Sequence, residues 1–488
     1  MGYLSKLTRN SVRDLNWILA LIMTSVPFEQ TLTAHEQWSR FRGPNGSGVS
    51  ESLGLPLEFD RDHNVLWKTS LPQGHSSPIL SENLIFLTAI RDNMLLTICL
   101  DRESGKILWE RAVPRSREEV IDKRNNSASP SPVVDDEYVY IFFPEYGVLA
   151  YDHAGQKQWH VTLGPFNNVY GMGASPILAG DTVILVCDQS TGSYLLALDK
   201  RTGSVRWKTE RPEAKSGHST PILYTPPEGE TQIIVPGSFL LTSYLASTGE
   251  KLWWVRGLSF EVKSVPVMNG DMIFVNGFGM PDNQPGRQIP VLPIEEVMKT
   301  RDSDNDGQLS PEELPDQRSR SYQRFIDLDQ NGFINKTEWN YYRAMSASEN
   351  GLLAIRVSNG RGDLTETNVE WRYHRAVPQL PSPLIYRNAL YMVNDGGIVT
   401  ALNPSNGKIL NQGRLHGAID HYYASPVAAD GKILMVSETG KVVILKPDGS
   451  LKVLKVNDLG ENCYSTPAIV DGHLYIRTVN ALYAFGQT

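Results

Sequence analysis

Two acidic segments of the sequence share one spacing of oxygen-bearing side chains. The first, DSDNDGQLSPEE, covers residues 302–313, and the second, DLDQNGFINKTE, covers residues 327–338. A calcium ion takes six to eight oxygen ligands at about 2.4 Å, and a twelve-residue loop supplies them from positions 1, 3, 5, 7, 9 and 12. The sixth position needs a sharp turn, and glycine stands there in both segments. The spacing therefore predicts two calcium sites.

The predicted ligands are mostly carboxylates. They are Asp302, Asp304, Asp306, the main-chain carbonyl of Gln308 and Glu313 in the first loop, and Asp327, Asp329, Asn331, the main-chain carbonyl of Phe333 and Glu338 in the second. The first loop offers four carboxylates and the second offers three. Because more ligand charge generally gives tighter binding, we expect the first loop to fill first.

The two loops resemble a pair of EF-hands, and the resemblance covers about residues 290–348. Helical patterns flank the loops, IEEVMKT before the first and EWNYYRAM after the second. Only thirteen residues separate Glu313 from Asp327, and Pro315 is among them. We therefore expect one helix shared by both loops. A shared helix would restrict the opening motion that calcium sensors of this kind use.

The composition excludes several classes of protein. The chain has 488 residues, of which 41% are hydrophobic and 20% charged, so it is globular and not disordered. The net charge of −8 argues against a nucleic-acid partner, because such binding depends on clustered lysine and arginine. The three cysteines, Cys99, Cys187 and Cys463, are far apart, which excludes a disulfide framework and a CxxC motif.

The first 34 residues differ from the rest of the chain. Lys6, Arg9 and Arg13 precede WILALIM, and the apolar stretch extends only to about Val26. A helix that crosses a bilayer needs about 20 apolar residues, and this stretch is half as long. We interpret residues 1–34 as a secretory signal peptide, with an uncleaved anchor as the alternative. The mature protein is then periplasmic or secreted and has no stable membrane span.

A short tag that ends in proline recurs eight times along the chain. The tag prolines are Pro78, Pro132, Pro176, Pro221, Pro266, Pro383, Pro426 and Pro467. Most of them stand 41 to 45 residues apart, while the first interval is 54 and the fifth is 117. The two acidic loops lie inside the fifth interval. They therefore interrupt one repeat and leave the others in phase.

A second tag follows in several repeats, as in LDKRTGSVRW, where a glycine stands four residues before a tryptophan. The pairs are Gly105 and Trp109, Gly155 and Trp159, Gly203 and Trp207, and Gly249 and Trp253. The pattern indicates a strand, a turn whose glycine permits positive φ, and an outer strand with a large ring. Segments such as YVYIFF and TVILVC have the β-branched and aromatic residues of strands.

Four short strands in each of eight repeats predict an all-β fold, an eight-bladed β-propeller. The α-helical EF-hand pair, residues 286–350, is inserted in the fifth blade and divides the propeller into residues 35–285 and 351–488. Only 21 residues follow Pro467, too few for four strands. We expect the strand around Trp67 to complete the last blade and remove an open edge. An open solenoid of the same units is the alternative.

The segment ALDKRTGSVRW, residues 197–207, resembles the tryptophan-docking repeat of pyrroloquinoline-quinone-type propellers. That superfamily includes the quinoprotein alcohol dehydrogenases and the BamB-type outer-membrane assembly propeller. The segment WSRFRGPNGSGVS, which begins at Trp38, is similar to the start of exported bacterial members. The repeats depart from the pattern at Asn411 and Val453, which occupy tryptophan positions.

The resemblance implies that a quinone enzyme of this superfamily holds its cofactor over a disulfide of adjacent cysteines, with calcium beside it. This chain has no adjacent cysteines, and its acidic loops belong to an insert, so we expect no pyrroloquinoline quinone. We expect a calcium-binding propeller that acts as a non-catalytic scaffold for a protein or peptide partner on one propeller face. The alternatives are a quinone-dependent dehydrogenase and a calcium-responsive sensor.

Propeller geometry suggests where a partner would bind. The residue three places before each tag proline should lie near one mouth of the central channel. These residues are His75, Ser129, Gly173, His218, Lys263, Leu380, Tyr423 and Tyr464. Among them, His75, His218, Lys263, Tyr423 and Tyr464 carry side chains suited to binding by polar and aromatic contacts. The alternative is that they are ordinary rim residues.

Overall fold

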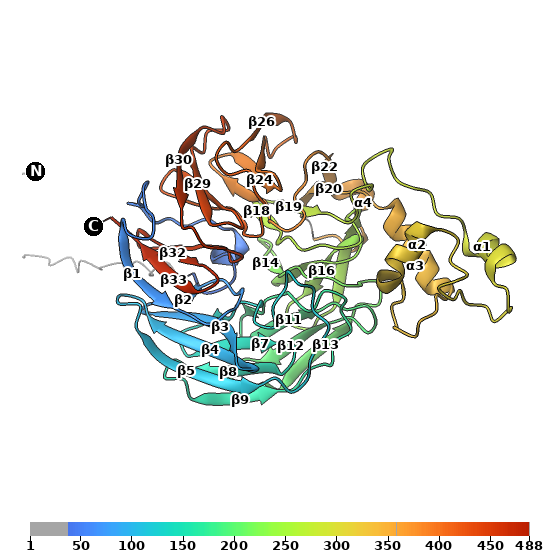
Figure 1. Ribbon diagram of the computed structural model, residues 1–488, viewed down its shortest axis with the longest axis horizontal. Helices are drawn as coiled ribbons and strands as arrows, with labels where there is room; N and C mark the ends of the chain where they lie inside the picture. The colour runs from blue at the N-terminus through green and yellow to red at the C-terminus, as the bar shows by residue number, and fades with distance from the viewer. Residues whose placement is uncertain (1–37, 358, 488) are drawn as a thin grey trace, which may run out of the picture. The chain divides into compact units, whose positions relative to one another are not determined.

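The computed structural model describes residues 38–357 and 359–487. The predicted signal peptide lies outside these residues. Figure 1 shows β-sheets arranged around a central axis, with the helices α1 to α3 outside the ring of sheets. There are eight sheets in the described residues, seven with four strands and one with five, and in the last blade three strands from the C-terminal end pair with β1. The structure confirms the eight-bladed β-propeller.

The first four blades follow one another in the chain. Blade 1 consists of β2 (Ile79–Leu80), β3 (Leu84–Arg91), β4 (Met94–Asp101) and β5 (Ile107–Pro114). Blade 2 consists of β6 (Val133–Val134), β7 (Tyr138–Phe143), β8 (Gly147–Asp152) and β9 (Lys157–Val161). Blade 3 consists of β10 (Ile177–Ala179), β11 (Thr182–Cys187), β12 (Tyr194–Asp199) and β13 (Val205–Glu210). Blade 4 consists of β14 (Ile222–Tyr224), β15 (Gln232–Pro236), β16 (Leu240–Leu245) and β17 (Lys251–Arg256), with β21 (Gly362–Asp363) added at its edge.

The last four blades complete the ring. Blade 5 consists of β18 (Val267–Asn269), β19 (Met272–Gly277), β20 (Gly351–Arg356) and β22 (Val369–Tyr373), with the short helix α4 (Thr365–Asn368) before β22. Blade 6 consists of β23 (Leu384–Tyr386), β24 (Ala389–Asn394), β25 (Ile398–Leu402) and β26 (Ile409–Arg414). Blade 7 consists of β27 (Val427–Ala429), β28 (Lys432–Val436), β29 (Lys441–Leu445) and β30 (Val453–Asp458). Blade 8 consists of β31 (Ala468–Val470), β32 (His473–Arg477), β33 (Ala481–Phe485) and β1 (Val65–Ser70).

The N-terminal strand closes the ring, as the sequence predicts. β1 pairs antiparallel with β33, so the first described strand and the last belong to one sheet. Trp67 lies in β1, where it aligns with Ala484. Because the fourth strand of blade 8 comes from the opposite end of the chain, the propeller has no blade with a missing outer strand.

The insert consists of three helices between β19 and β20. They are α1 (Ile294–Arg301), α2 (Gln317–Ile326) and α3 (Lys336–Ala347). One helix, α2, lies between the two acidic loops, which matches the shared helix expected from the short spacing. Asp316 caps α2 by accepting a hydrogen bond from the Ser319 backbone nitrogen, which satisfies a donor that the helix itself leaves unpaired.

Burial explains the strand patterns. Middle strands such as β12 bury all residues after the first, because another blade covers each face. Outer strands such as β1 alternate between half-buried and exposed residues, because only one face meets a neighbouring blade. The core is therefore distributed between neighbouring blades and forms several apolar clusters around the ring.

Tryptophans on outer strands dock onto the turn of the next blade. The indole nitrogens of Trp67, Trp109, Trp159, Trp207 and Trp371 donate to the carbonyls of Arg102, His153, Lys200, Ala246 and Pro404 at 2.9 to 3.1 Å. Asn411, at a position where the pattern expects tryptophan, donates to the Ser450 carbonyl at 2.8 Å. The hydrogen bond between neighbouring blades is therefore kept at this position, although asparagine lacks the indole ring of tryptophan.

A ring of hydrogen bonds joins the blades near the axis. In seven cases the backbone nitrogen of the residue before a tag proline donates to the side-chain hydroxyl of the equivalent residue in the next blade, at 2.9 to 3.0 Å. The residues in order are Ser77, Ser131, Ser175, Thr220, Val265, Ser382, Ser425 and Thr466. The link from Thr220 to Val265 is missing because valine has no hydroxyl. Seven of the eight tags have a serine or threonine before the proline because its hydroxyl accepts the hydrogen bond from the neighbouring blade.

The segment after Trp38 crosses several blades close to this ring. The carbonyls of Trp38 and Ser39 accept from the backbone nitrogens of Leu80 and Val134, at 2.9 Å in each case. The same segment forms the turn η1 (Pro44–Gly46), and further along the Gly48 carbonyl accepts from the Ala428 nitrogen at 2.8 Å. We refer to residues 38–50 as the crossing segment. It ties blades 1, 2 and 7 together.

The tryptophan docking gives a test of blade packing. Gly105 has φ +69°, and a Cβ atom there would lie 2.3 Å from Cε3 of Trp67. Gly180 has φ +58° with open space around it, so Gly180→Ala is a matched control for backbone strain alone. We expect Gly180→Ala to reduce the free energy of unfolding by about 1 kcal/mol and Gly105→Ala by about 3 kcal/mol. Denaturant unfolding measures both, and equal losses would contradict the docking.

Candidate functional site

The second acidic loop connects α2 to α3 and gathers three carboxylates. One oxygen from each of Asp327, Asp329 and Glu338 lies within 4.8 Å of the others. Glu338 is buried, and its carboxylate accepts hydrogen bonds from the backbone nitrogens of Leu328 at 2.8 Å and Asn335 at 2.9 Å. Burial raises the pKa of Glu338, and the negative charge of Asp329 adds to this rise. A bound cation would offset both effects.

The first loop has the same spacing but a different arrangement. Oxygens of Asp302, Asp304 and Asp306 lie within 4.8 Å of one another. The Glu313 carboxylate instead accepts hydrogen bonds from the nitrogens and hydroxyls of Ser310 and Ser303, at 2.7 to 2.9 Å. These bonds, led by the one from the Ser310 nitrogen, lower the pKa of Glu313 to about 2. Glu338 accepts the same two backbone bonds in the second loop, so among these contacts the loops differ in the serine hydroxyls that also donate to Glu313. That the first loop fills first stays a prediction.

The two loops are paired through their eighth residues. The backbone nitrogen of Leu309 donates to the Ile334 carbonyl at 2.9 Å, and the nitrogen of Ile334 donates to the Leu309 carbonyl at the same distance. Both side chains are buried in the apolar core of the insert. The sixth residues, Gly307 and Gly332, have φ of +84° and +90°, which only glycine adopts without strain. Hard oxygen donors around a sharp turn fit a calcium ion.

The second loop and its entering helix contact the propeller. The Asn167 side chain donates to the Leu328 carbonyl at 2.7 Å, and Arg324 donates to the Val169 carbonyl at 2.7 Å. The rings of Phe325 and Tyr170 have their centroids 5.5 Å apart. Residues 167–170, which we call the bridging segment, lie between β9 and β10 in the chain. Both acidic loops belong to the insert. The second loop, together with α2, is held against the propeller by these contacts with the bridging segment.

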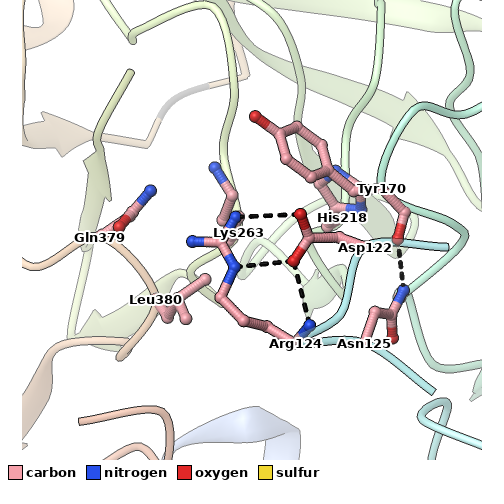
Figure 2. Close-up of a pocket in the computed structure, with 9 residues that line it drawn as sticks. Asp122, Arg124, Asn125, Tyr170, His218, Lys263, Gln379 and Leu380 are labelled. Atoms are coloured by element: carbon pink, nitrogen blue, oxygen red, sulfur yellow. Dashed lines mark hydrogen bonds and ion pairs between the residues drawn. The ribbon is translucent and has the colours of Figure 1, made fainter. Parts of the chain in front are cut away.

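One end of the bridging segment reaches a cavity of about 170 Å³. Tyr170 lines this cavity, and Figure 2 shows its ring close to His218 and Lys263. A second cavity, of about 500 Å³, shares Arg124, Gln379 and Leu380 with the first. The two cavities are therefore adjoining parts of one hollow, which we call the mouth.

The cations of the first cavity are paired with carboxylates. Arg124 Nε lies 2.7 Å from Asp122 Oδ1, and Lys263 Nζ lies 2.7 Å from Glu261 Oε2. Figure 2 marks the contact between Arg124 and Asp122 with dashed lines. Lys263 also stands over the Tyr170 ring, 5.8 Å from its centroid. The cavity therefore offers aromatic and hydrogen-bonding surface with its charges largely balanced.

Both predicted histidines of the mouth are neutral at pH 7. Burial, together with the positive charge of Lys263, lowers the pKa of His218 to about 3. Burial, together with Arg477, lowers the pKa of His75 to about 4. The Nε2 atom of His218 is buried and has no hydrogen-bond partner among the described residues. A neutral imidazole with an unpaired nitrogen is suited to a hydrogen bond with a ligand.

Tyrosines dominate the second cavity. Tyr423 and Tyr464 both line it, with ring centroids 5.2 Å apart, and Tyr464 stacks on His75 at 4.5 Å. The hydroxyl of Tyr464 donates to Glu438 at 3.1 Å. His421 lies 3.3 Å from Asp395, and the hydrogen bond to that carboxylate raises the pKa of His421. This half of the mouth thus contains a histidine that gains a proton more readily than the buried ones do.

The structure brings most of the predicted mouth residues together. Gly173, His218, Lys263 and Leu380 line the first cavity, and Leu380, Tyr423 and Tyr464 line the second. His75 reaches the mouth only through Tyr464, and Ser129, whose hydroxyl accepts from the Asn126 nitrogen, lines neither cavity.

Several mouth residues were not anticipated from the sequence. Asp122, Arg124 and Asn125 come from the connection between β5 and β6. One feature of the sequence indicated that this connection is long. The interval between the first two tag prolines exceeds all others except the one that holds the insert. Gln379, His421 and Glu438 stand beside predicted positions or in other loops, and the repeat gave no signal for them.

The residues do not fit a quinone held over adjacent cysteines with calcium beside it. The three cysteines lie in blades 1 and 3 and after β30, and all are buried. Burial raises the pKa of Cys99 and of Cys463 to about 12. Among residues 38–357 and 359–487, the groups of acidic side chains close enough to share a metal are the two in the insert. The mouth holds no such group.

Fold and site together define a β-propeller of tryptophan-docked blades with a paired-loop insert of the EF-hand kind. The family model for the outer membrane protein assembly factor BamB matches residues 57–222 and 341–486, so the chain belongs to that family. The EF-hand family model matches residues 324–340, which contain the second loop. A search of curated proteins found no match.

Solved structures of low sequence identity share the fold. BamB from Moraxella catarrhalis is 14% identical, with a TM-score of 0.53, over 86% of this chain and 98% of that one. A europium-containing methanol dehydrogenase is 10% identical, with a TM-score of 0.57, over 93% and 98%. The quinohemoprotein alcohol dehydrogenase from Comamonas testosteroni is 11% identical, with a TM-score of 0.54, over 93% and 81%. At these identities the likeness concerns the fold alone.

No helix in the part of the chain that the structure describes is a candidate for a membrane-spanning segment. Each helix there is too short or too polar to cross a bilayer.

Proposed function

We propose that the protein is an exported, calcium-binding propeller that binds a protein or peptide partner at the mouth without catalysing a reaction. The observation that carries this proposal is the mouth itself, where Tyr170, Tyr423 and Tyr464 surround a hollow. Two of its cations, Arg124 and Lys263, are paired with carboxylates. Tyrosine is enriched at protein interfaces because it combines a large apolar ring with a polar tip.

Further support for a macromolecular partner comes from the mixed polarity of the mouth. Acidic groups such as Glu438 and Asp395 line the second cavity together with basic groups such as Arg124 and His421. A peptide presents backbone donors and acceptors together with charged side chains, so it can match such a surface. The family takes its description from an outer membrane protein assembly factor, which also favours a protein partner.

Two further parts of the proposal concern location and calcium. The basic residues and short apolar stretch before Val26 support export to the periplasm or the medium. Exported calcium modules bind at about 10⁻⁴ to 10⁻³ M. At a calcium concentration tenfold above the dissociation constant, each site would gain about 1.4 kcal/mol of stability. Such a gain would be enough to order the insert, while the eight blades would fold without bound calcium.

Calorimetric titration tests the two calcium sites. We expect two sites in the wild type and one in each of Glu313→Gln and Glu338→Gln, because the twelfth residue is the bidentate ligand of such a loop. Glu312→Gln, at an exposed position next to Glu313, is the matched control and should keep both sites. Wild-type protein that binds no calcium, or an unchanged site count in Glu338→Gln, would refute the assignment.

A calcium-responsive role is the second candidate, and the bridging segment favours it. Leu328 follows the first ligand of the second loop, and its carbonyl accepts from Asn167. Arg324 and Phe325 of α2 contact Val169 and Tyr170, and Tyr170 lines the mouth. An ion that fixes the second loop would therefore restrict Tyr170 through direct contacts. No large opening of the helices is required.

Site-specific crosslinking tests where the partner binds. A photoreactive phenylalanine analogue replaces Leu380, which lines both cavities, or Val205, an exposed residue at the start of the outer strand β13. In extracts of the native exported fraction, we expect the Leu380 position to give one discrete crosslinked product and the Val205 position to give none.

Replacement of mouth side chains gives the control for that experiment. The combined change His218→Ala, Lys263→Ala and Tyr423→Ala should reduce the crosslink from position 380 at least tenfold, because it removes polar and aromatic contacts together. Unchanged far-ultraviolet circular dichroism would show that the blades remain folded. An undiminished crosslink in this variant, or the same product from position 205, would place the binding surface elsewhere.

A further inference from the structure

Two arginines of the crossing segment are buried without an acidic partner. Arg40 is 7% exposed and Arg42 is 0% exposed. Within residues 38–357 and 359–487, neither guanidinium lies within ion-pair distance of a carboxylate. Buried charges in proteins are normally paired, because removal of a charge from water is costly. These two positive charges are therefore unusual, and something must compensate for them.

The contacts of both guanidiniums place them where the inner strands converge. Arg40 Nη2 donates to the Pro221 carbonyl at 2.6 Å. Arg42 Nη2 donates to the carbonyls of Pro383 at 2.9 Å and Pro426 at 3.4 Å. These three prolines belong to the tags of blades 4, 6 and 7, directly after members of the hydroxyl ring. The two arginines thus reach the axis from one segment and contact blades on different sides of it.

Three nitrogens of the pair have no acceptor. Arg40 Nε, Arg42 Nε and Arg42 Nη1 are buried and make no hydrogen bond to any described residue. Every guanidinium nitrogen carries hydrogen and none can accept, so each of these atoms needs an acceptor or an anion. Burial lowers the pKa of Arg42 to about 9, and the charge of Arg40 contributes. Both groups still carry their charge at neutral pH.

A third buried arginine shows how this propeller satisfies a guanidinium with carbonyls alone. Arg477 is 1% exposed, and its Nη1 donates to the carbonyls of Ser76 and Thr88 at 3.1 and 2.8 Å and to the Ser76 hydroxyl at 2.7 Å. Its Nη2 donates to the Pro72 carbonyl at 3.3 Å, so only Nε is left over. Arg42 leaves two of its three nitrogens unpaired, and a second cation stands nearby.

We propose that Arg40 and Arg42 together bind one small anion, a halide or an inorganic oxyanion, near the axis of the propeller. Such an anion supplies acceptors to the unpaired nitrogens and neutralises charge that the protein leaves unbalanced. Guanidinium groups suit this task because they are weakly hydrated and present several donors in one plane. The bound ion would fasten the crossing segment to blades 4, 6 and 7. It is independent of calcium and of the mouth.

Anion titration of thermal stability is the first test. Sodium gluconate, whose anion is too large for a closed site, keeps the ionic strength constant while chloride or phosphate replaces it. We expect a saturable rise in the melting temperature of the wild type, about 2 °C at tenfold excess over the dissociation constant. Preference for chloride or for phosphate distinguishes a halide site from an oxyanion site.

Matched variants decide whether the arginines are responsible. Arg42→Leu should lose the saturable rise, while Arg201→Leu, which removes an arginine that is 62% exposed, should retain it. If Arg42→Leu does not fold, Arg42→Lys replaces it and should weaken the apparent affinity at least tenfold, because lysine offers one nitrogen instead of three. A saturable rise that persists in the Arg42 variant would overturn the proposal.

Crystals of the wild type grown in sodium bromide provide a direct measurement. We expect an anomalous bromide peak within hydrogen-bonding distance of Arg42 and Arg40. A water molecule at that place with no anomalous signal, in protein that shows no saturable response to chloride or phosphate, would overturn the proposal.

Discussion

The hydrogen bond from a backbone nitrogen of one blade to a hydroxyl of the next is the constraint on which the rest of the structure depends. Seven such bonds connect neighbouring blades around the axis, and all the hydroxyl groups involved are buried. They fix where each inner strand starts. Six of the eight residues that stand two places before a ring member line the mouth, and tryptophan docking secures the outer strands of five blades.

The helical insert is compatible with this ring because of where it enters. β19 and β20 are adjacent antiparallel strands, and Gly277 aligns with Gly351 across the start and end of the insert. The insert therefore leaves blade 5 from one point of the sheet and returns to the same point, and its folding need not disturb the blades. Its second loop nevertheless contacts residues 167–170 in the connection between blades 2 and 3. Through that contact the second acidic loop and the mouth become neighbours.

Much of the fold followed from the sequence because the repeat is local and periodic. The proline tags revealed the blades, and the short stretch after Pro467 revealed closure by the N-terminal strand. The two acidic loops were equally visible, because their pattern is set by spacing within twelve residues, and calcium binding by them stays a prediction. What the sequence could not give were contacts between distant segments. The bond between Asn167 and Leu328 and the burial of Arg42 both depend on how distant segments pack in three dimensions.

We propose that calcium in the second loop acts on the partner-binding mouth through residues 167–170, and hydrogen exchange measured by mass spectrometry tests this link most directly. Exchange is compared with and without calcium in the wild type and in Glu338→Gln. The account predicts that calcium slows exchange in residues 327–338 and in residues 167–170 of the wild type, while the strands of the eight blades remain unchanged. In Glu338→Gln the slowing at both places should disappear. Slower exchange in the loop with no change at residues 167–170 would contradict the account.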